Sequence, residues 1–344
     1  MKAVSYRSPG GIEVLEYTDM PDPEPGTLDV VVAVEACALN RLDAVQRHGW
    51  YQLPGFTYPH IAGMDIAGTV VAIGGGVRDV AVGQRVVVDP SLAGVAEGSK
   101  LAGRGDFYGD LGVIGANVDG GYAELCLAPA SHVYPVPDDM PIEHAATFPT
   151  CFLTAAHGLF EVGRLVAGET VLIHAAGSGV SVAAIQLAKF AGATVLATAG
   201  TDAKCEHALA IGADYTLNNR TEDVAAWARE LTAGAGVRIV FDHVGTALFG
   251  TSLFALGVRG RLVNCGNSSG DAATIPSLGY LYHHGLSILG SDPYRPEEFG
   301  RVWHTFCEQR FPAVIDSEFP LADAGLAQEK LLANDAFGKI LLRP

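Results

Sequence analysis

The feature that most constrains the fold is an alternation of apolar segments that begins near residue 150. Short apolar runs predict buried strands at 169–176, 193–200, 214–218, 237–244 and 259–266. Between them, apolar residues at helical spacing predict helices over 180–192, 202–213, 221–234 and 246–257. Strand–helix repetition with short turns predicts an α/β domain built on a doubly wound parallel sheet, over residues 151–289.

Residues 1–150 have a different character, with strands and turns and few helical patterns. The runs at 30–39, 67–73 and 83–89 are rich in β-branched residues, and glycine- and proline-rich loops separate them. These residues predict a mostly-β domain. The tail after residue 290 predicts two helices and a final strand, GKILLRP, and periodicity alone does not decide which domain the tail joins.

Composition excludes several classes of protein. The chain has 344 residues, of which 49% are hydrophobic, and its formal net charge of −16 argues against binding to nucleic acid or to an anionic membrane. No apolar run reaches the roughly 18 residues of a membrane-spanning helix, and no apolar secretory segment is present. Six scattered cysteines with no C-x-x-C spacing fit a reducing compartment, so we expect a cytoplasmic protein that acts on a small molecule.

A glycine-rich turn follows the first strand of the parallel sheet. Gly177, Ser178, Gly179 and Val180 connect the strand VLIH to a helix, where backbone N–H groups can meet a pyrophosphate. The turn departs from a strict G-x-G-x-x-G, since alanine and serine stand where glycines are expected. The alternative is that these residues form an ordinary strand–helix turn of small residues, whose sequence would look similar.

The tip of the next strand bears on which dinucleotide binds. An NAD site usually has an acidic residue here for the ribose hydroxyls. The tip reads Thr198-Ala199-Gly200-Thr201, with Lys204 nearby, and this absence of an acid favours NADPH over NADH. The alternative is that Asp202, one residue further on, binds the ribose.

Motifs spread over nearly the whole chain resemble the medium-chain dehydrogenase/reductase superfamily, in particular its zinc-type alcohol dehydrogenases and zinc-free quinone and enoyl reductases. They are ALNRLD (38–43), PHIAGMDIAGTVVAIG (59–74), GQRVVV (83–88), DGGYAEL (119–125), HAAGSGVSVAAIQLAK (174–189), IGAD (211–214), FDHVG (241–245) and GKILL (338–342). The resemblance implies a GroES-like catalytic domain over 1–150 and 290–344, and a Rossmann domain over 151–289. It also implies a homodimer or homotetramer formed through the Rossmann domain.

The turn and the resemblance together predict the cofactor-binding residues. They are Thr150, Thr154, Gly177, Ser178, Gly179, Val180, Thr198, Gly200, Thr201, Lys204, Asn219, Asp242, Val244, Gly245, Cys265, Gly266, Asn267 and Lys339.

The positions of the family's zinc ligands carry other residues here. The three catalytic-zinc positions fall on Asn40, Met64 and Thr150, a set without the nitrogen and sulfur donors that zinc prefers. The family's proton relay positions hold Leu42 and Val45. The four cysteine positions of its structural zinc lobe fall on Gly94, Glu97, Lys100 and Tyr108. We therefore expect no zinc and no simple alcohol oxidation.

Zinc-free members of this superfamily reduce an activated C=C bond, in an enone or enoyl thioester, or a quinone, and the resemblance implies such a reaction here. Such a reaction needs a hydride, a donor for the developing oxyanion and a proton source. Tyr51 is the candidate proton donor, or else packs over the substrate. Asn40 is the candidate amide donor, or else stabilises its loop. Asp65 is a charged pocket residue, or else is buried and paired with Arg41 or Arg47.

Two other functions stay open on the sequence. One is an alcohol or carbonyl dehydrogenase with an atypical metal site. The other is a non-catalytic NADPH-binding sensor or partner protein.

Overall fold

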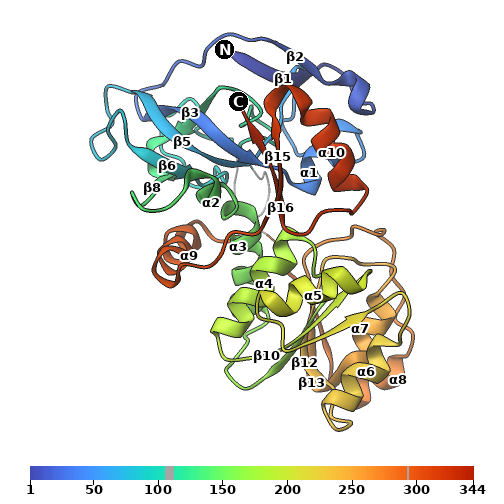
Figure 1. Cartoon of the computed structure of the whole chain (residues 1–344). Helices are drawn as coiled ribbons and strands as arrows, with labels where there is room; N and C mark the ends of the chain where they lie inside the picture. Colours follow the sequence, from blue (N-terminus) through green and yellow to red (C-terminus); the bar gives the residue numbers. More distant parts are fainter. Residues whose placement is uncertain (105–111, 293) are drawn as a thin grey trace. The chain divides into compact units, whose positions relative to one another are not determined.

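The computed structural model describes residues 1–104, 112–292 and 294–344, so Tyr108 lies outside the described residues. The chain divides into two units. The first comprises Met1–Thr150 together with Arg295–Pro344, and the second comprises Cys151–Tyr294. Figure 1 shows the chain coloured along its length.

The second unit is built on a six-stranded sheet in which every neighbouring pair is parallel. The strand order is β11-β10-β9-β12-β13-β14. The strands are β9 (Thr170–Ile173), β10 (Thr194–Ala199), β11 (Tyr215–Asn218), β12 (Val237–Asp242), β13 (Leu256–Asn264) and β14 (Ser287–Gly290). This order reverses direction at β9, which is where ligands bind in open α/β sheets, beyond the carboxyl ends of the strands.

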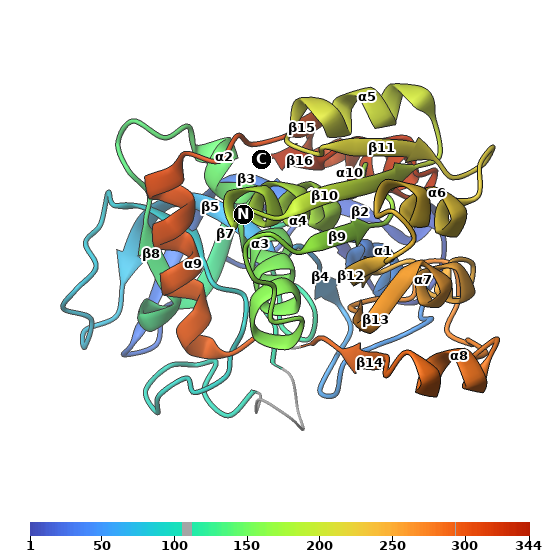
Figure 2. The ribbon, with the colours of Figure 1, turned by 90° about the horizontal axis from the view of Figure 1, so that it is seen from below.

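Helices connect these strands and pack around the sheet, as Figures 1 and 2 show. They are α3 (Pro149–Ala156), which begins in the first unit, α4 (Gly179–Phe190), α5 (Asp202–Ala210), α6 (Val224–Leu231), α7 (Phe249–Ala255) and α8 (Leu278–His283), with a π-helical turn η3 (His157–Val162) after α3. Leu172, Leu196, Val240 and Leu262, from the four central strands, form part of one buried core. A strand buried on both faces explains why these segments read as continuous apolar runs.

The first unit contains two sheets. A three-stranded sheet has the order β2-β1-β4, and a larger one has the order β15-β16-β3-β5-β6-β8, with β7 also paired to β3. The strands are β1 (Lys2–Tyr6), β2 (Glu16–Asp19), β3 (Asp29–Ala38), β4 (His60–Ile61), β5 (Asp65–Ile73), β6 (Arg85–Val88), β7 (Leu125–Pro129), β8 (Val133–Pro135), β15 (Ile315–Pro320) and β16 (Lys339–Arg343).

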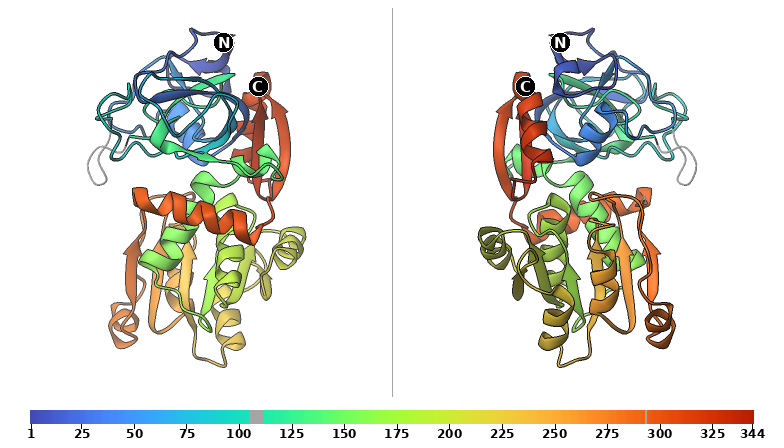
Figure 3. Two further views of the ribbon diagram at one scale, coloured as in Figure 1. Left: turned by 90° about the vertical axis from the view of Figure 1, so that its left-hand side faces the viewer. Right: turned by 90° about the vertical axis from the view of Figure 1, so that its right-hand side faces the viewer.

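The helices of the first unit are short, apart from α9. They are α1 (Arg41–Arg47), α2 (Ile142–Ala146), α9 (Pro296–Gln309) and α10 (Ala324–Leu332), with 3-10 turns η1 (Ile12–Val14), η2 (Ala130–His132) and η4 (Leu321–Asp323). The tail is part of this unit, because β16 pairs antiparallel with β3 at Leu341–Ala38 and Leu342–Cys37. That pairing brings Lys339 beside the end of β3, and Figure 3 shows the tail strands next to the β-rich part of the unit.

The predicted fold class is confirmed, a doubly wound parallel sheet together with a mostly-β unit. Element ends differ by a few residues, as for the helix expected over 180–192 and found at Gly179–Phe190. The sequence interpretation missed β14, β15 and α8, which are short and contain no fully buried residue, and so lack a buried periodic pattern. Among the described residues, no helix is long and apolar enough to cross a membrane.

Candidate active site and dinucleotide site

A buried cluster of polar side chains lies in the first unit where β3, β5 and β16 meet. Lys339 Nζ donates hydrogen bonds to Asp65 Oδ2 at 2.8 Å, to Asn40 Oδ1 at 2.8 Å and to the backbone oxygen of Leu39 at 2.6 Å. The other carboxylate oxygen of Asp65 accepts the backbone N–H of Thr150 at 2.9 Å and its hydroxyl at 2.5 Å. Four residues that the sequence singled out therefore belong to one network, which we call the Lys339 cluster (Asn40, Asp65, Thr150 and Lys339).

Asn40 is held on its backbone as well as on its side chain. It is the N-cap of α1, and its N–H donates to Asp43 Oδ2 at 2.8 Å. Tyr122 donates its hydroxyl to the same oxygen at 3.0 Å. Burial raises the pKa of Asp43 to about 7, while these two hydrogen bonds oppose the rise.

The Lys339 cluster does not fit a zinc ion. Of the family's three ligand positions, Asn40 turns its oxygen to an ammonium, and Thr150 donates its hydroxyl to Asp65. Met64 packs in a small apolar group with Leu53 and Ala116. The Lys339 ammonium, 2.8 Å from Asn40 Oδ1, repels a second cation. Among the described residues, no group of three or more His, Cys, Asp and Glu side chains could hold a metal ion.

The partner of Asp65 differs from the sequence expectation. Its side chain is fully buried, and its ion pair is with Lys339, not with Arg41 or Arg47. The guanidinium of Arg47 donates instead to Gln328 Oε1 at 2.7 Å and to the backbone oxygen of Gly10 at 2.7 Å. The contact with Lys339 spans most of the chain, so local spacing could not reveal it.

Tyr51 lies on the loop that follows α1. Its side chain is 55% exposed, and the neighbouring Trp50 stacks on His48 with ring centroids 4.2 Å apart. Among the described residues, no recorded hydrogen bond joins Tyr51 to the Lys339 cluster. Its role as proton donor stays a prediction.

In the second unit, the glycine-rich turn connects β9 to the amino end of α4. The backbone N–H of Ser178 donates a hydrogen bond to the backbone oxygen of Ala175 at 2.8 Å, and Ala175 has a φ of +51°. Helix α4 begins at Gly179 and runs for 12 residues. The first N–H groups of a helix have no intrahelical acceptor, so Gly179 and Val180 present donors at the positive end of the helix dipole.

A buried polar network lies beneath this turn. Ser252 donates to Asp242 Oδ2 at 3.0 Å, so its oxygen accepts from His174 Nε2, which is also 3.0 Å away. The other ring nitrogen, Nδ1, then accepts the hydroxyl of Thr198 at 2.9 Å. Thr198, a predicted cofactor residue, thus donates its hydroxyl hydrogen to another side chain of the protein. Burial lowers the pKa of His174 to about 4, which keeps the ring neutral at pH 7.

The tips of β10 and β11 lie side by side, since Ala199 is in register with Asn218. A Cβ at Gly200 would come within 3.0 Å of Arg220 Nε, so the exposed guanidinium of Arg220 lies over the tip of β10. The sequence interpretation missed Arg220. A basic residue two positions after the strand 214–218 was the available signal.

Asp202 and Thr201, next to this tip, both accept hydrogen bonds from within the protein. Asp202 Oδ1 accepts from Asn218 Nδ2 at 2.7 Å, and Thr201 caps α5 by accepting the N–H of Lys204 at 3.3 Å. Asn219, another predicted cofactor residue, donates its backbone N–H to the oxygen of Ala199 at 2.9 Å. The bond from Asn218 uses only Oδ1 of Asp202, so the alternative in which Asp202 binds a ribose stays open.

The loops after β12 and β13 contain the remaining predicted cofactor residues of the second unit. Asp242 Oδ1 accepts the N–H groups of Val244 at 2.7 Å and Gly245 at 3.1 Å. Gly245 has a φ of +80°, which favours glycine. Cys265, Gly266 and Asn267 follow β13, and Cys265 N–H donates to the oxygen of Asp242 at 2.9 Å. Asp242 therefore fixes both loops at the carboxyl edge of the sheet. Thr154 lies half-buried on α3.

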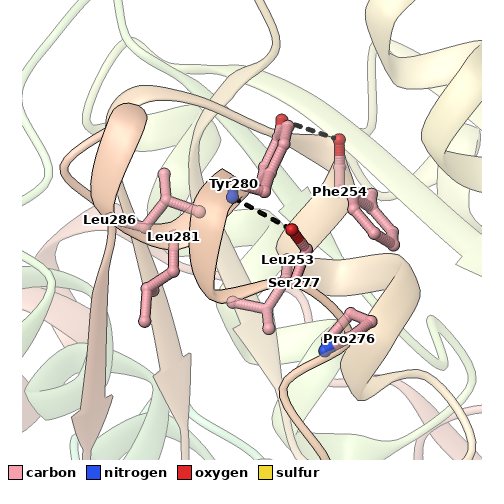
Figure 4. Close-up of a pocket in the computed structure, with 7 residues that line it drawn as sticks. All are labelled: Leu253, Phe254, Pro276, Ser277, Tyr280, Leu281 and Leu286. Carbon is pink, nitrogen blue, oxygen red and sulfur yellow. Dashed lines mark hydrogen bonds between the residues drawn. The ribbon is translucent and has the colours of Figure 1, made fainter.

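A hollow between α7 and α8 has no evident chemical role (Figure 4). Its lining is mostly apolar, and its polar groups are already paired. Tyr280 donates its hydroxyl to the oxygen of Leu256 at 2.8 Å, and Ser277 Oγ accepts the N–H of Tyr280 at 3.0 Å. The first bond anchors α8 to β13, and the second caps the start of α8.

Comparisons with known proteins identify the family of the chain. Residues 26–138 match the alcohol dehydrogenase GroES-like domain, and residues 179–308 match the zinc-binding dehydrogenase family. A quinone oxidoreductase of Pseudomonas aeruginosa is 32% identical over 356 residues, covering 100% of this chain and 99% of that protein.

Two solved structures are similar over their whole length. A structure described as an NAD-dependent alcohol dehydrogenase has a TM-score of 0.92 and 37% identity, with 100% of both chains covered. An Escherichia coli quinone oxidoreductase complexed with NADPH has a TM-score of 0.83 and 28% identity, again with 100% of both chains covered.

Proposed function

This chain is an oxidoreductase of the medium-chain dehydrogenase/reductase superfamily, and we propose that it is a zinc-independent, NADPH-dependent reductase. Its acceptor is a quinone or another conjugated carbonyl compound, such as an enone or enoyl thioester. The observation that carries the proposal is the Lys339 ammonium, bonded at 2.8 Å to Asn40 Oδ1, at one of the family's zinc-ligand positions, and at 2.8 Å to Asp65 Oδ2. A built-in cation there supports chemistry without a metal.

The second unit supports the choice of NADPH. The turn at Ala175–Ser178 and the start of α4 suit a pyrophosphate, and Arg220 over Gly200 suits a 2′-phosphate. NADPH, when bound, supplies a hydride to a carbon conjugated with the carbonyl group. The known binding of NADPH by the similar Escherichia coli enzyme points the same way.

The remaining steps fall to residues of the first unit. Asn40 donates a hydrogen bond from Nδ2 to the carbonyl oxygen, which gains negative charge as the hydride arrives. The phenol of Tyr51 then delivers the proton that completes a two-electron reduction. Each turnover thus consumes one hydride and one proton and leaves a reduced acceptor and oxidised cofactor.

The test is NADPH consumption by the purified protein against quinones, enones, enoyl thioesters and aldehydes, with NADH in parallel. We expect turnover with at least one conjugated acceptor and a preference for NADPH. Absence of turnover on all conjugated acceptors would contradict the proposal.

Alcohol or carbonyl dehydrogenation is the second candidate, favoured by the likeness to the structure described as an NAD-dependent alcohol dehydrogenase. Oxidation of a panel of alcohols with NAD⁺ and NADP⁺ distinguishes it.

We also propose assembly through the second unit. Strand β14 is the edge of the parallel sheet, and Ile288 on it is 39% exposed. An unpaired edge with exposed apolar side chains can pair with a second copy of the chain.

A further inference from the structure

We infer that Lys339 is a positioning residue, which fixes the amide of Asn40 so that Nδ2 is the hydrogen-bond donor presented to the acceptor oxygen. The inference rests on the proposed function and assigns Lys339 a role in the reduction step instead of in cofactor binding.

The orientation of the Asn40 amide follows from the chemistry of its neighbour. An ammonium has only donors, so the atom of Asn40 that lies 2.8 Å from Lys339 Nζ must be the oxygen. The nitrogen Nδ2 then points away from Lys339. With the amide turned over, two donors would face each other inside the protein. Lys339 thereby removes the freedom of the amide to flip.

The Nδ2 donor is buried and unsatisfied among the described residues. Asn40 is 8% exposed, and Nδ2 has no hydrogen-bond partner, although the backbone N–H and Oδ1 of the same residue are both bonded. A buried donor without an acceptor costs free energy, and such groups are rare unless a ligand or water completes them. The arrangement suits a carbonyl oxygen as the missing acceptor.

Asp65 bears on whether the oxygen that accepts the hydrogen bond from Asn40 Nδ2 is neutral or charged. Its carboxylate lies 2.8 Å from Lys339 Nζ, and both side chains are nearly or fully buried. The pair is neutral as a whole, so the donor beside it carries no net positive charge. A neutral donor suits an uncharged carbonyl, as in a quinone, enone or thioester, and gives no particular preference for a free carboxylate.

The rest of the cluster keeps Lys339 in place. Its third acceptor is the backbone oxygen of Leu39, next to Asn40 in the chain, and Thr150 holds the far oxygen of Asp65 with two hydrogen bonds. The ammonium is thus fixed by three acceptors, and its position fixes the amide. Lys339 does not need to contact the acceptor for this role.

A double-mutant cycle tests the inference, with kcat, KM and NADPH binding measured for each protein. Asn40→Ala removes the donor and should lower kcat/KM roughly 10- to 100-fold. Lys339→Gln lets the amide adopt either orientation and should lower kcat/KM about tenfold, mostly through kcat. If Lys339 acts through Asn40, the double variant should be no worse than Asn40→Ala by more than about twofold.

Three controls separate this role from a structural one. NADPH affinity should stay within about twofold of wild type in all variants. Lys330→Gln removes a lysine bonded to Asp316 in the same unit and should leave kcat/KM unchanged. Lys339→Arg, which also presents only donors, should keep kcat/KM within about fivefold, and it replaces Lys339→Gln in the test if that variant fails to fold.

Multiplicative losses in the double variant would overturn the inference, as would a greater loss in Lys339→Arg than in Lys339→Gln. Failure of the wild type to reduce any conjugated acceptor would overturn the proposed function, and the inference with it. An active wild type with multiplicative losses would overturn the inference alone.

Discussion

Replacing Arg220 with alanine is expected to weaken the binding of NADPH and to leave the binding of NADH unchanged. The guanidinium lies over the tip of β10, where a Cβ at Gly200 would come within 3.0 Å of its Nε. A phosphate on the cofactor ribose at this tip would accept a charge-assisted hydrogen bond from it. NADH has no such phosphate, so the loss should be confined to NADPH.

The magnitude follows from the exposure of the site. Hydrogen bonds to charged groups contribute about 1.5–3 kcal/mol, and the exposure of Arg220 favours the lower end of that range. A loss of about 1.5–2 kcal/mol corresponds to a roughly 10- to 30-fold weaker Kd for NADPH. The effect should also diminish at high salt, because exposed charges are screened.

The assay is fluorescence titration of each protein with NADPH and NADH, together with KM for both cofactors on one acceptor. Arg220→Lys keeps the charge and should lose less affinity than Arg220→Ala. Arg238→Ala is the matched control, because Arg238 lies near the amino end of β12 and bonds to Glu169. Equal losses for the two cofactors, or no loss for NADPH, would refute this use of Arg220.

Three further predictions concern other parts of the chain. Tyr51→Phe should lower kcat roughly tenfold or more, as expected for loss of a general acid, with an unchanged melting temperature because the side chain is 55% exposed; full activity would exclude Tyr51 as the proton donor. Asp65→Asn removes the counterion of a buried lysine and should lower the free energy of unfolding by about 3–5 kcal/mol, measured by urea denaturation; a change near zero would show that the pair contributes little. Burial lowers the pKa of His174 from 6.5 to about 4. The free energy of unfolding should therefore fall by about 3 kcal/mol as the pH falls from 6.5 toward 4, because the unfolded chain takes up the proton first. His174→Gln should therefore show a smaller fall in melting temperature than wild type between pH 7 and pH 4.5, and equal falls would contradict the assignment.

Much of the second unit could be predicted from the sequence, because its strands are buried on both faces and its helices have one apolar face. The strand expected at 193–200 corresponds to Thr194–Ala199, and the helix expected at 202–213 to Asp202–Ala210. The edge strand β14 and helix α8 were missed, since exposed elements carry a weak apolar pattern.

The candidate site was less predictable, because its contacts join distant parts of the chain. Asn40, Asp65, Thr150 and Lys339 were all singled out, yet for three separate reasons, and nothing in their spacing placed them in one network. The network depends on the pairing of β16 with β3, which brings the last residues of the chain to the end of an early strand. Arg220 was missed for a related reason, since it reaches the tip of β10 only through the parallel pairing of β10 with β11.

The most direct test of metal-free reduction is the zinc content of the active enzyme. Protein purified without added metal would be analysed for zinc and assayed for NADPH-dependent reduction of its best acceptor, before and after treatment with a chelator. We predict zinc well below one per chain and a rate that the chelator does not change, because the Lys339 ammonium is bonded to Asn40 at one of the family's zinc-ligand positions. One zinc per chain together with a rate abolished by chelation and restored by zinc would contradict this prediction.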